Sequence, residues 1–146
     1  NSGNMAVSDT MDVEKITDKS DHCGKSGAVV AATGKNDIVS DGRKAYWIQN
    51  GHSMMQTVTG VGCQLSALTA AYVAANPKHT LEAVTAAVSA IGVCGELAYE
   101  RMSDLDGNAS YRNYLIDAVY RLDGKKLERL ARVEKVNEDG EKSNEM

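Results

Sequence analysis

The stretch Gln56-Thr57-Val58-Thr59-Gly60-Val61-Gly62-Cys63 leads directly into an apolar run from Gln64 to Ala75. β-Branched residues that enter two glycines and then a helix predict a tight turn at a helix start. Because glycine has no Cβ atom, the backbone at Gly60 and Gly62 can turn sharply and approach a ligand closely. The free N–H groups of the first helical turn would favour an anion there, most naturally a phosphate.

Cys63 falls in the first turn of this predicted helix. A helix N-terminus favours the thiolate form of cysteine, and the thiol would lie beside any bound anion. Two simpler interpretations stay open on spacing alone. A G-x-G before a helix is also an ordinary tight turn, and a single cysteine is often a small buried apolar residue.

Length and composition favour one globular domain. The chain has 146 residues, of which 42% are hydrophobic and 25% charged. A net charge of −4 without a basic stripe argues against a nucleic-acid partner. We expect no membrane partner, because no uninterrupted apolar run reaches spanning length and no signal peptide opens the sequence.

The cysteines Cys23, Cys63 and Cys94 are odd in number and widely spaced. They predict neither a disulfide framework nor a metal site, so a reducing cytoplasm is the simplest setting. A P-loop interpretation of Gly24-Lys25-Ser26 fails for two reasons. Lys19 stands where the motif needs a glycine, and a strand rather than a helix follows.

The chain divides into a polar amino-terminal segment (1–26), an α/β core (27–124) and a charged helix and partly disordered tail (125–146). Within the core we predict a buried strand ending at Thr33-Gly34 and a hairpin of 37–40 and 44–49 turning at Asp41-Gly42. Helices follow from the glycine turn to Ala75, from Leu81 (capped by Thr80) to about Arg101, and from Ala109 to Leu122. Residues 125–136 are weakly amphipathic.

Other residues outside the glycine turn are candidates for a site, each with a simpler alternative. Thr33 and Gly34 end a strand, where ligands gather in open α/β sheets, although an ordinary turn explains them equally well. His52 is favoured as a surface or capping residue. Glu96 and Glu100 are spaced as a solvated helix face rather than as a catalytic carboxylate pair.

The order of these motifs resembles the carboxyl-terminal half of the hydroxyethylthiazole kinases, from about Val7 to Gly124. The matching stretches are Ala32-Thr33-Gly34, Asp37 to Gly42, Asn50-Gly51-His52-Ser53-Met54-Met55, Val58 to Ala67, Gly95-Glu96-Leu97-Ala98 and the helix from Tyr111 to Leu122. The glycine turn with its cysteine is the most diagnostic of them.

The resemblance implies a ribokinase-like three-layer αβα fold, here a partial version with few strands and a helical carboxyl-terminal half. It implies transfer of the ATP γ-phosphate, with Mg²⁺, to the hydroxyl of 4-methyl-5-(2-hydroxyethyl)thiazole in thiamine salvage, by a trimer. Thr33 would bind ATP, and Gly60 would lie by the substrate. The amides of Gly60, Val61, Gly62 and Cys63 would form an anion hole, and Cys63 would stand where related sugar kinases keep an aspartate base.

Two departures from the family pattern keep alternatives open. Val61 replaces the threonine of the usual Gly-Thr-Gly-Cys turn, and the chain looks truncated or internally deleted relative to the family. A non-catalytic nucleotide-binding or assembly module of the same fold is the alternative function. Another ribokinase-like kinase is disfavoured, because those enzymes usually carry aspartate at the Cys63 position.

Overall fold

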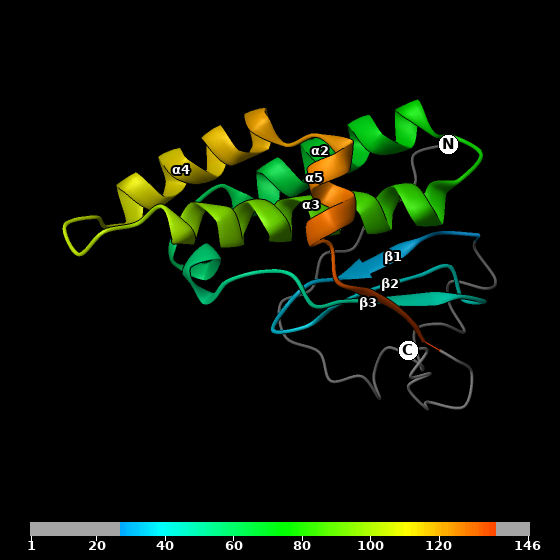
Figure 1. The fold of residues 1–146 in the computed structure, drawn as a ribbon. Helices are drawn as coiled ribbons and strands as arrows, with labels where there is room; N and C mark the ends of the chain where they lie inside the picture. Colours follow the sequence, from blue (N-terminus) through cyan, green and yellow to red (C-terminus); the bar gives the residue numbers. More distant parts are fainter. Residues whose placement is uncertain (1–26, 137–146) are drawn as a thin grey trace.

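The computed structural model describes residues 27–136 (Figure 1). The polar segment 1–26, with Cys23 and the rejected P-loop, and the tail after Val136 lie outside these residues. The predicted division of the chain into three segments stays a prediction.

Four short strands form one antiparallel sheet in the order β1-β2-β3-β4. They are β1 (Val30–Ala32), β2 (Asp37–Ser40), β3 (Ala45–Ile48) and β4 (Val133–Val136). The hairpin predicted at Asp41-Gly42 is confirmed, with Ser40 paired to Ala45. The Asp41 carboxylate accepts hydrogen bonds from the backbone N–H groups of Arg43 and Lys44, which closes the turn.

The strand directions correct the reasoning applied to Thr33 and Gly34. It was based on ligands gathering at the carboxyl ends of strands in an open α/β sheet, an arrangement typical of parallel strands. In the described residues β1 runs antiparallel to β2, so Thr33 and Gly34 lie in a hairpin connection. So short a connection permits only an antiparallel neighbour, because parallel strands need a crossover of a dozen or more residues.

The helical elements are η1 (Ser53–Thr57, a 3₁₀-helix), α2 (Val61–Ala75), α3 (Thr80–Glu100), α4 (Asn108–Arg121) and α5 (Gly124–Leu130). The predicted limits of α3 and α4 agree to within one residue. Thr80, however, is the first residue of α3 and not its cap, since its hydroxyl donates to the carbonyl of Pro77.

The segment 125–136 differs most from its prediction. The Asp123 side chain caps α5 by accepting a hydrogen bond from the Lys126 N–H, and the helix ends at Leu130. The chain then turns back, and β4 pairs with β3 so that Val133 lies opposite Ile48. Weak helical periodicity over 125–136 is thus explained by a short helix followed by an exposed edge strand.

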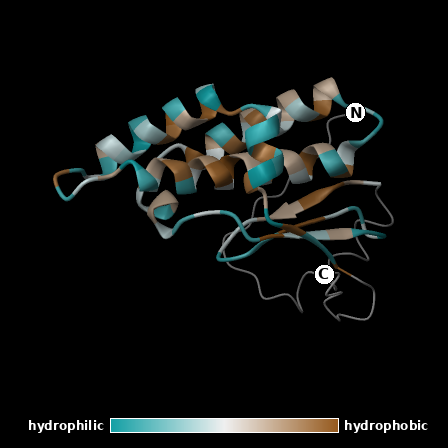
Figure 2. Ribbon diagram, in the orientation of Figure 1, coloured by the Kyte–Doolittle hydropathy of each residue, from teal (hydrophilic) through white to brown (hydrophobic). Residues whose placement is uncertain are grey.

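Helix α3 is the centre of the core. It packs against α2, α4 and α5 on one side and against β1, β2 and β3 on the other, and the helices all cover one face of the sheet (Figure 1). Both α3 and the strands are rich in apolar residues (Figure 2), and buried side chains of both belong to one hydrophobic core. By length and composition α3 could span a membrane, but 78% of its apolar window is buried inside the fold, as in a core helix.

Two glycines of α3 let other segments approach its backbone. A Cβ atom on Gly92 would lie 2.8 Å from the backbone oxygen of Asn50, and one on Gly95 would lie 2.3 Å from the sulfur of Met55. The connection from β3 to η1 therefore rests directly on the carboxyl-terminal half of α3.

Helix α4 is joined to the same part of α3. Tyr111, fully buried on α4, donates its hydroxyl to the carbonyl of Gly95 at 3.0 Å.

Candidate functional site

The predicted glycine turn lies at the start of α2. Gly60 is the N-cap residue and has a left-handed backbone with φ of 99°, a conformation that side chains disfavour. The first intrahelical bond runs from the Gln64 N–H to the Gly60 carbonyl at 3.0 Å, and no side chain caps the helix. The N–H groups of Val61, Gly62 and Cys63 are therefore left without a helical acceptor and point out of the helix start.

The exposure of these residues suits contact with a ligand. Gly62 and Cys63 are exposed, whereas Val61 is half-buried against the core. Cys63 carries a free thiol, so the interpretation of Cys63 as a small buried apolar residue is wrong. Cys94 takes that role on α3: it is fully buried, and burial raises the pKa of its thiol to about 11.

The residues Ser53–Thr57 before the turn form the 3₁₀-helix η1, although the stretch that enters the two glycines is rich in β-branched residues. The His52 imidazole accepts a hydrogen bond from the Met54 N–H, which caps η1, and the Thr57 hydroxyl donates back to the Met54 carbonyl. Val58, which follows η1, is extended. Local side-chain hydrogen bonds of this kind outweigh the β propensity of Thr57 and its neighbours.

The turn is also fixed from outside. The Asn108 amide, at the start of α4, donates to the Thr57 carbonyl at 3.1 Å, and the Thr57 hydroxyl donates to the Asn108 side-chain oxygen at 3.3 Å. His52 stacks on Tyr99 of α3, with ring centroids 3.7 Å apart. The predicted capping role of His52 is confirmed. The glycine turn is thus held against both α3 and α4.

Thr33 lies apart from this turn along the chain, in the β1–β2 connection. Among residues 27–136, no hydrogen bond or ion pair joins Thr33 to residues 60–63. The notable group next to this connection is Asp37, the first residue of β2, which the sequence did not single out. Burial raises the pKa of its carboxyl to about 6, although the hydrogen bond from the Gly34 N–H (2.8 Å) lowers it in part.

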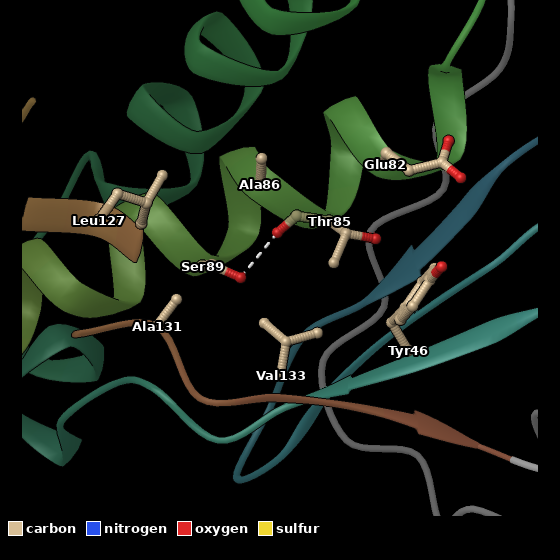
Figure 3. A pocket seen from close by; sticks show the side chains of 8 residues that line it. All are labelled: Tyr46, Glu82, Thr85, Ala86, Ser89, Leu127, Ala131 and Val133. Atoms are coloured by element: carbon tan, nitrogen blue, oxygen red, sulfur yellow. Dashed lines mark hydrogen bonds between the residues drawn. The ribbon is translucent and has the colours of Figure 1, made fainter. Parts of the chain in front are cut away.

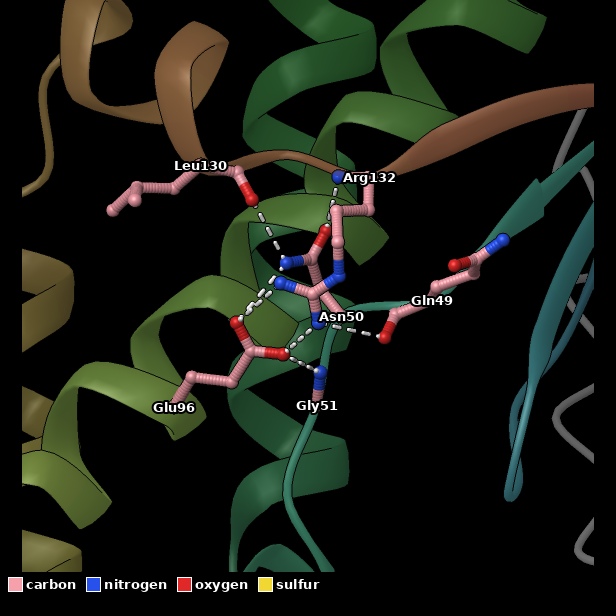
Figure 4. A network of polar contacts seen from close by, with 6 residues as sticks. All are labelled: Gln49, Asn50, Gly51, Glu96, Leu130 and Arg132. Atoms are coloured by element: carbon pink, nitrogen blue, oxygen red, sulfur yellow. Dashed lines mark hydrogen bonds and ion pairs between the residues drawn. The ribbon is translucent and has the colours of Figure 1, made fainter.

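The spacing of Glu96 and Glu100 predicts that both lie on a solvated helix face. For Glu96 this prediction is wrong. Its carboxylate accepts hydrogen bonds from the Gly51 N–H, the Asn50 amide and the Arg132 guanidinium (Figure 4). Burial opposes the charge of Glu96, but these hydrogen bonds outweigh it and hold the pKa of the carboxyl below its ordinary value. Glu100 is exposed, as predicted.

Asn50 completes this group of contacts, which we call the Glu96 network: Asn50, Gly51, Glu96 and Arg132. The buried Asn50 side chain accepts from the Arg132 N–H at 2.7 Å and donates to the Leu130 carbonyl at 3.0 Å. Arg132 also donates to the Gln49 carbonyl at 3.0 Å. The network joins the segment after β3, the carboxyl-terminal part of α3 and the α5–β4 connection, so its first role is structural.

A metal site is not evident in the described part of the chain. Within residues 27–136, no three His, Cys, Asp or Glu side chains gather closely enough to hold a metal ion. The glycine turn instead presents three backbone N–H donors beside the thiol of Cys63. Such a set can bind an anion and stabilise negative charge without a cationic side chain.

Comparison with known proteins shows the family to which the chain belongs. The model of the hydroxyethylthiazole kinase family matches residues 4–125. A curated hydroxyethylthiazole kinase of Clostridium acetobutylicum is 56% identical over 110 residues, which are 75% of this chain and 40% of that protein. The Arabidopsis thaliana hydroxyethylthiazole kinase is 45% identical over 98 residues, 67% of this chain and 34% of its own length.

A solved structure is also similar. The hydroxyethylthiazole kinase of Pyrococcus horikoshii superposes with a TM-score of 0.74 at 34% identity, covering 85% of this chain and 47% of that one. The predicted partial version of the ribokinase-like α/β fold is confirmed, with few strands and a helical carboxyl-terminal half. Of its three predicted layers, residues 27–136 form two, the sheet and the helices on one face of it. The chain spans less than half the length of these relatives.

Proposed function

Because the chain belongs to the hydroxyethylthiazole kinase family, we propose that it transfers the γ-phosphate of ATP to the hydroxyl of 4-methyl-5-(2-hydroxyethyl)thiazole, a step of thiamine salvage. The observation that carries the proposal is the uncapped start of α2. There the N–H groups of Val61, Gly62 and Cys63 have no helical acceptor.

These three N–H groups bind the phosphoryl group in transit. Phosphoryl transfer is catalysed mainly by positioning and by stabilising charge on the equatorial oxygens, so fixed backbone donors suit it. The left-handed Gly60 aims the donors, and its missing side chain leaves room for the substrate. Val61 lacks the hydroxyl of the usual threonine but keeps its backbone donor.

Cys63 is the base that we assign to the reaction. Its exposed thiol is in the same helical turn as the anion hole, where a thiolate can take the proton of the thiazole hydroxyl as the new P–O bond forms. Thr33 is assigned to ATP by resemblance to the family. We propose that the connection after β1, in which Asp37 fixes the Gly34 backbone, contributes to the nucleotide side of the site.

The remaining partners follow from the family and not from contacts in this structure. ATP supplies the phosphoryl group, and Mg²⁺ neutralises its charge when bound. Since residues 27–136 hold no group of three metal-ligating side chains, we assign the ion to no residue. A trimer in the cytoplasm is the proposed working form.

The test is an assay of phosphorylated thiazole by mass spectrometry, with the 146-residue chain, ATP, Mg²⁺ and the thiazole alcohol. We expect product, a rate about 100-fold lower for Cys63→Ala, and a rate largely kept by Cys63→Asp, since a carboxylate can also take the proton. Cys94→Ala, on the buried side of α3, tests whether losing any cysteine has this effect. Absence of product from the folded chain, or equal rates for Cys63→Ala and the parent, would overturn the proposal.

A further inference from the structure

A groove lies on the far half of α3 from the glycine turn. This open groove has a volume of about 290 Å³, near the lower size limit of small-molecule pockets. Its lining residues are Tyr46, Glu82, Thr85, Ala86, Ser89, Leu127, Ala131 and Val133 (Figure 3). They come from α3, β3, α5, the α5–β4 connection and the start of β4, so segments distant in sequence form one concavity.

The wall formed by α5 and β4 is held in place by the Glu96 network. Arg132 lies between two lining residues, Ala131 and Val133, and its backbone N–H and its guanidinium are both engaged by Asn50 and Glu96. Val133 is also fixed opposite Ile48 by the sheet register. The groove is therefore pre-formed rather than a gap beside a loose segment.

Two of the polar groups in the groove, the hydroxyls of Thr85 and Ser89, have a shared hydrogen-bonding character. The Thr85 hydroxyl donates to the Leu81 carbonyl and the Ser89 hydroxyl to the Thr85 carbonyl, each at 2.8 Å. With their protons engaged, both oxygens offer only lone pairs to a ligand. Thr85 and Ser89 are nearly buried, at 7% and 2% exposure, so these acceptors face an apolar space.

The two ends of the groove differ in charge, because a carboxylate lies at only one of them. Glu82 is exposed at one end, close in the view to the Tyr46 ring (Figure 3). Within residues 27–136, Glu82 makes no ion pair. Lys135 pairs with Tyr46 across the sheet, is itself exposed, and is not bonded to Glu82. A carboxylate at the end of an apolar, acceptor-lined groove complements a cation on an apolar body.

We propose that this groove binds a small, largely apolar molecule that carries a protonated amine, with the amine at Glu82 and the apolar body between Ala86, Leu127 and Val133. Glu82 would repel an anion, and the hydroxyl protons of Thr85 and Ser89 are already engaged by backbone carbonyls. The inference does not depend on the proposed kinase activity, because none of the lining residues belongs to the Gly60–Cys63 turn or to Thr33.

The test is a calorimetric titration of the 146-residue chain with 2-phenylethylammonium, with phenylacetate as the anion of similar shape. We expect saturable binding of the ammonium and none of phenylacetate. Glu82→Gln should bind the ammonium about fivefold more weakly. Glu100→Gln, the same change at an exposed site on the same helix outside the groove, should bind it as the parent does.

A second variant keeps the test independent of Glu82. Val133→Lys places a positive charge in the groove wall at a position already 38% exposed, and it should abolish ammonium binding while the far-ultraviolet circular dichroism stays unchanged. Three results would overturn the proposal: no saturable binding to the parent chain, equal binding of both probes, or unchanged binding by Val133→Lys. Sedimentation showing a dimer that Val133→Lys dissociates would also overturn it, because a second copy would then fill the groove.

Discussion

At the scale of single residues, the backbone of Gly60 is the most demanding feature of the candidate site. Its φ of 99° is open to glycine and costly for other residues, whereas Gly62 lies in the regular helix. A Cβ atom built on either residue would meet no atom from elsewhere in the fold within 4 Å. The difference between the two glycines is thus conformational and not steric.

We therefore expect Gly60→Ala to lower the free energy of unfolding by about 1–2 kcal/mol. Gly62→Ala should leave it unchanged or slightly raised, because alanine favours the helix. Chemical denaturation of the two variants checks this. Equal losses would mean that the left-handed turn is not maintained in solution.

Asp37 gives the protein a pH dependence of defined sign. Burial raises the pKa of its folded-state carboxyl to about 6 from 3.8. The folded protein therefore holds this proton more tightly, and the contribution of Asp37 to stability is greatest below about pH 4 and declines as the pH rises through 6. Asp37→Asn, which keeps an acceptor for the Gly34 N–H, should remove this decline.

Asp41 provides the matched control for Asp37. Burial opposes its charge, but the backbone N–H groups of Lys44 and Arg43 outweigh burial and lower the pKa of its carboxyl. The contribution of Asp41 to the free energy of unfolding is therefore present at neutral pH and lost on acidification. Asp41→Asn should remove this loss at low pH, whereas Asp37→Asn should remove the decline at higher pH. Urea denaturation between pH 4 and 7 distinguishes them. A decline between pH 4 and 6 that survives in Asp37→Asn would contradict the assignment.

At the scale of elements, the β3–η1 connection packs directly on the backbone of α3, and it can do so only because α3 carries glycines at the two points of contact. Gly92 meets backbone atoms of Asn50, which cannot move without disturbing the Glu96 network. Gly95 meets the end of the flexible Met55 side chain, which can adjust. The same added methyl group should thus have different effects at the two positions.

Gly92→Ala should destabilise the protein by about 1–3 kcal/mol, as overpacking does, and Gly95→Ala by less. Thermal unfolding of both variants measures the difference. If Gly95→Ala is the more destabilising, the contact between Asn50 and α3 is not as close as described.

The Glu96 network should couple α3 to the α5–β4 segment. Glu96 is 23% exposed and receives two hydrogen bonds from Arg132, whereas the pair Arg101–Asp117 is about half exposed on both sides and has a single bond of 3.0 Å. Less solvent and more hydrogen bonds strengthen an ion pair.

Double-mutant cycles test this difference, with Glu96→Gln and Arg132→Ala in one cycle and Asp117→Asn and Arg101→Ala in the other. We expect a coupling energy of about 1 kcal/mol or more for the first pair and less than about 0.5 kcal/mol for the second. Coupling energies of similar size would mean that the Glu96 network does not hold the α5–β4 segment.

At the scale of the whole molecule, local patterns and long-range contacts differ in how far the sequence predicts them. The Asp41-Gly42 hairpin, the helix ends and the turn at Gly60 depend on neighbouring residues, and they were predictable from turn chemistry and periodicity. The pairing of β4 with β3 joins residues about 85 positions apart, as in the hydrogen bond from Gln49 to Glu134. Periodicity within a short window cannot report such a pairing.

The same limit explains the residues that the sequence did not identify. Glu96 looks like a solvated residue because its partners, Asn50 and Arg132, come from distant segments. Asp37 looks like an ordinary strand residue because its burial depends on packing. The one signal available was that Asn50-Gly51 and Glu96 both fall within stretches that resemble the family. The groove could not be predicted at all, since four elements form it.

The central claim is that the start of α2 is a phosphate site, and a titration of the ¹⁵N-labelled chain with ATP tests it most directly. The amide resonances of Val61, Gly62 and Cys63 should shift saturably and together, with smaller shifts near Thr33 and none along the groove residues Thr85 to Ser89. If ATP binds and the three amides of the turn do not shift, or if ATP leaves the whole spectrum unchanged, the Gly60–Cys63 turn is not the phosphate site.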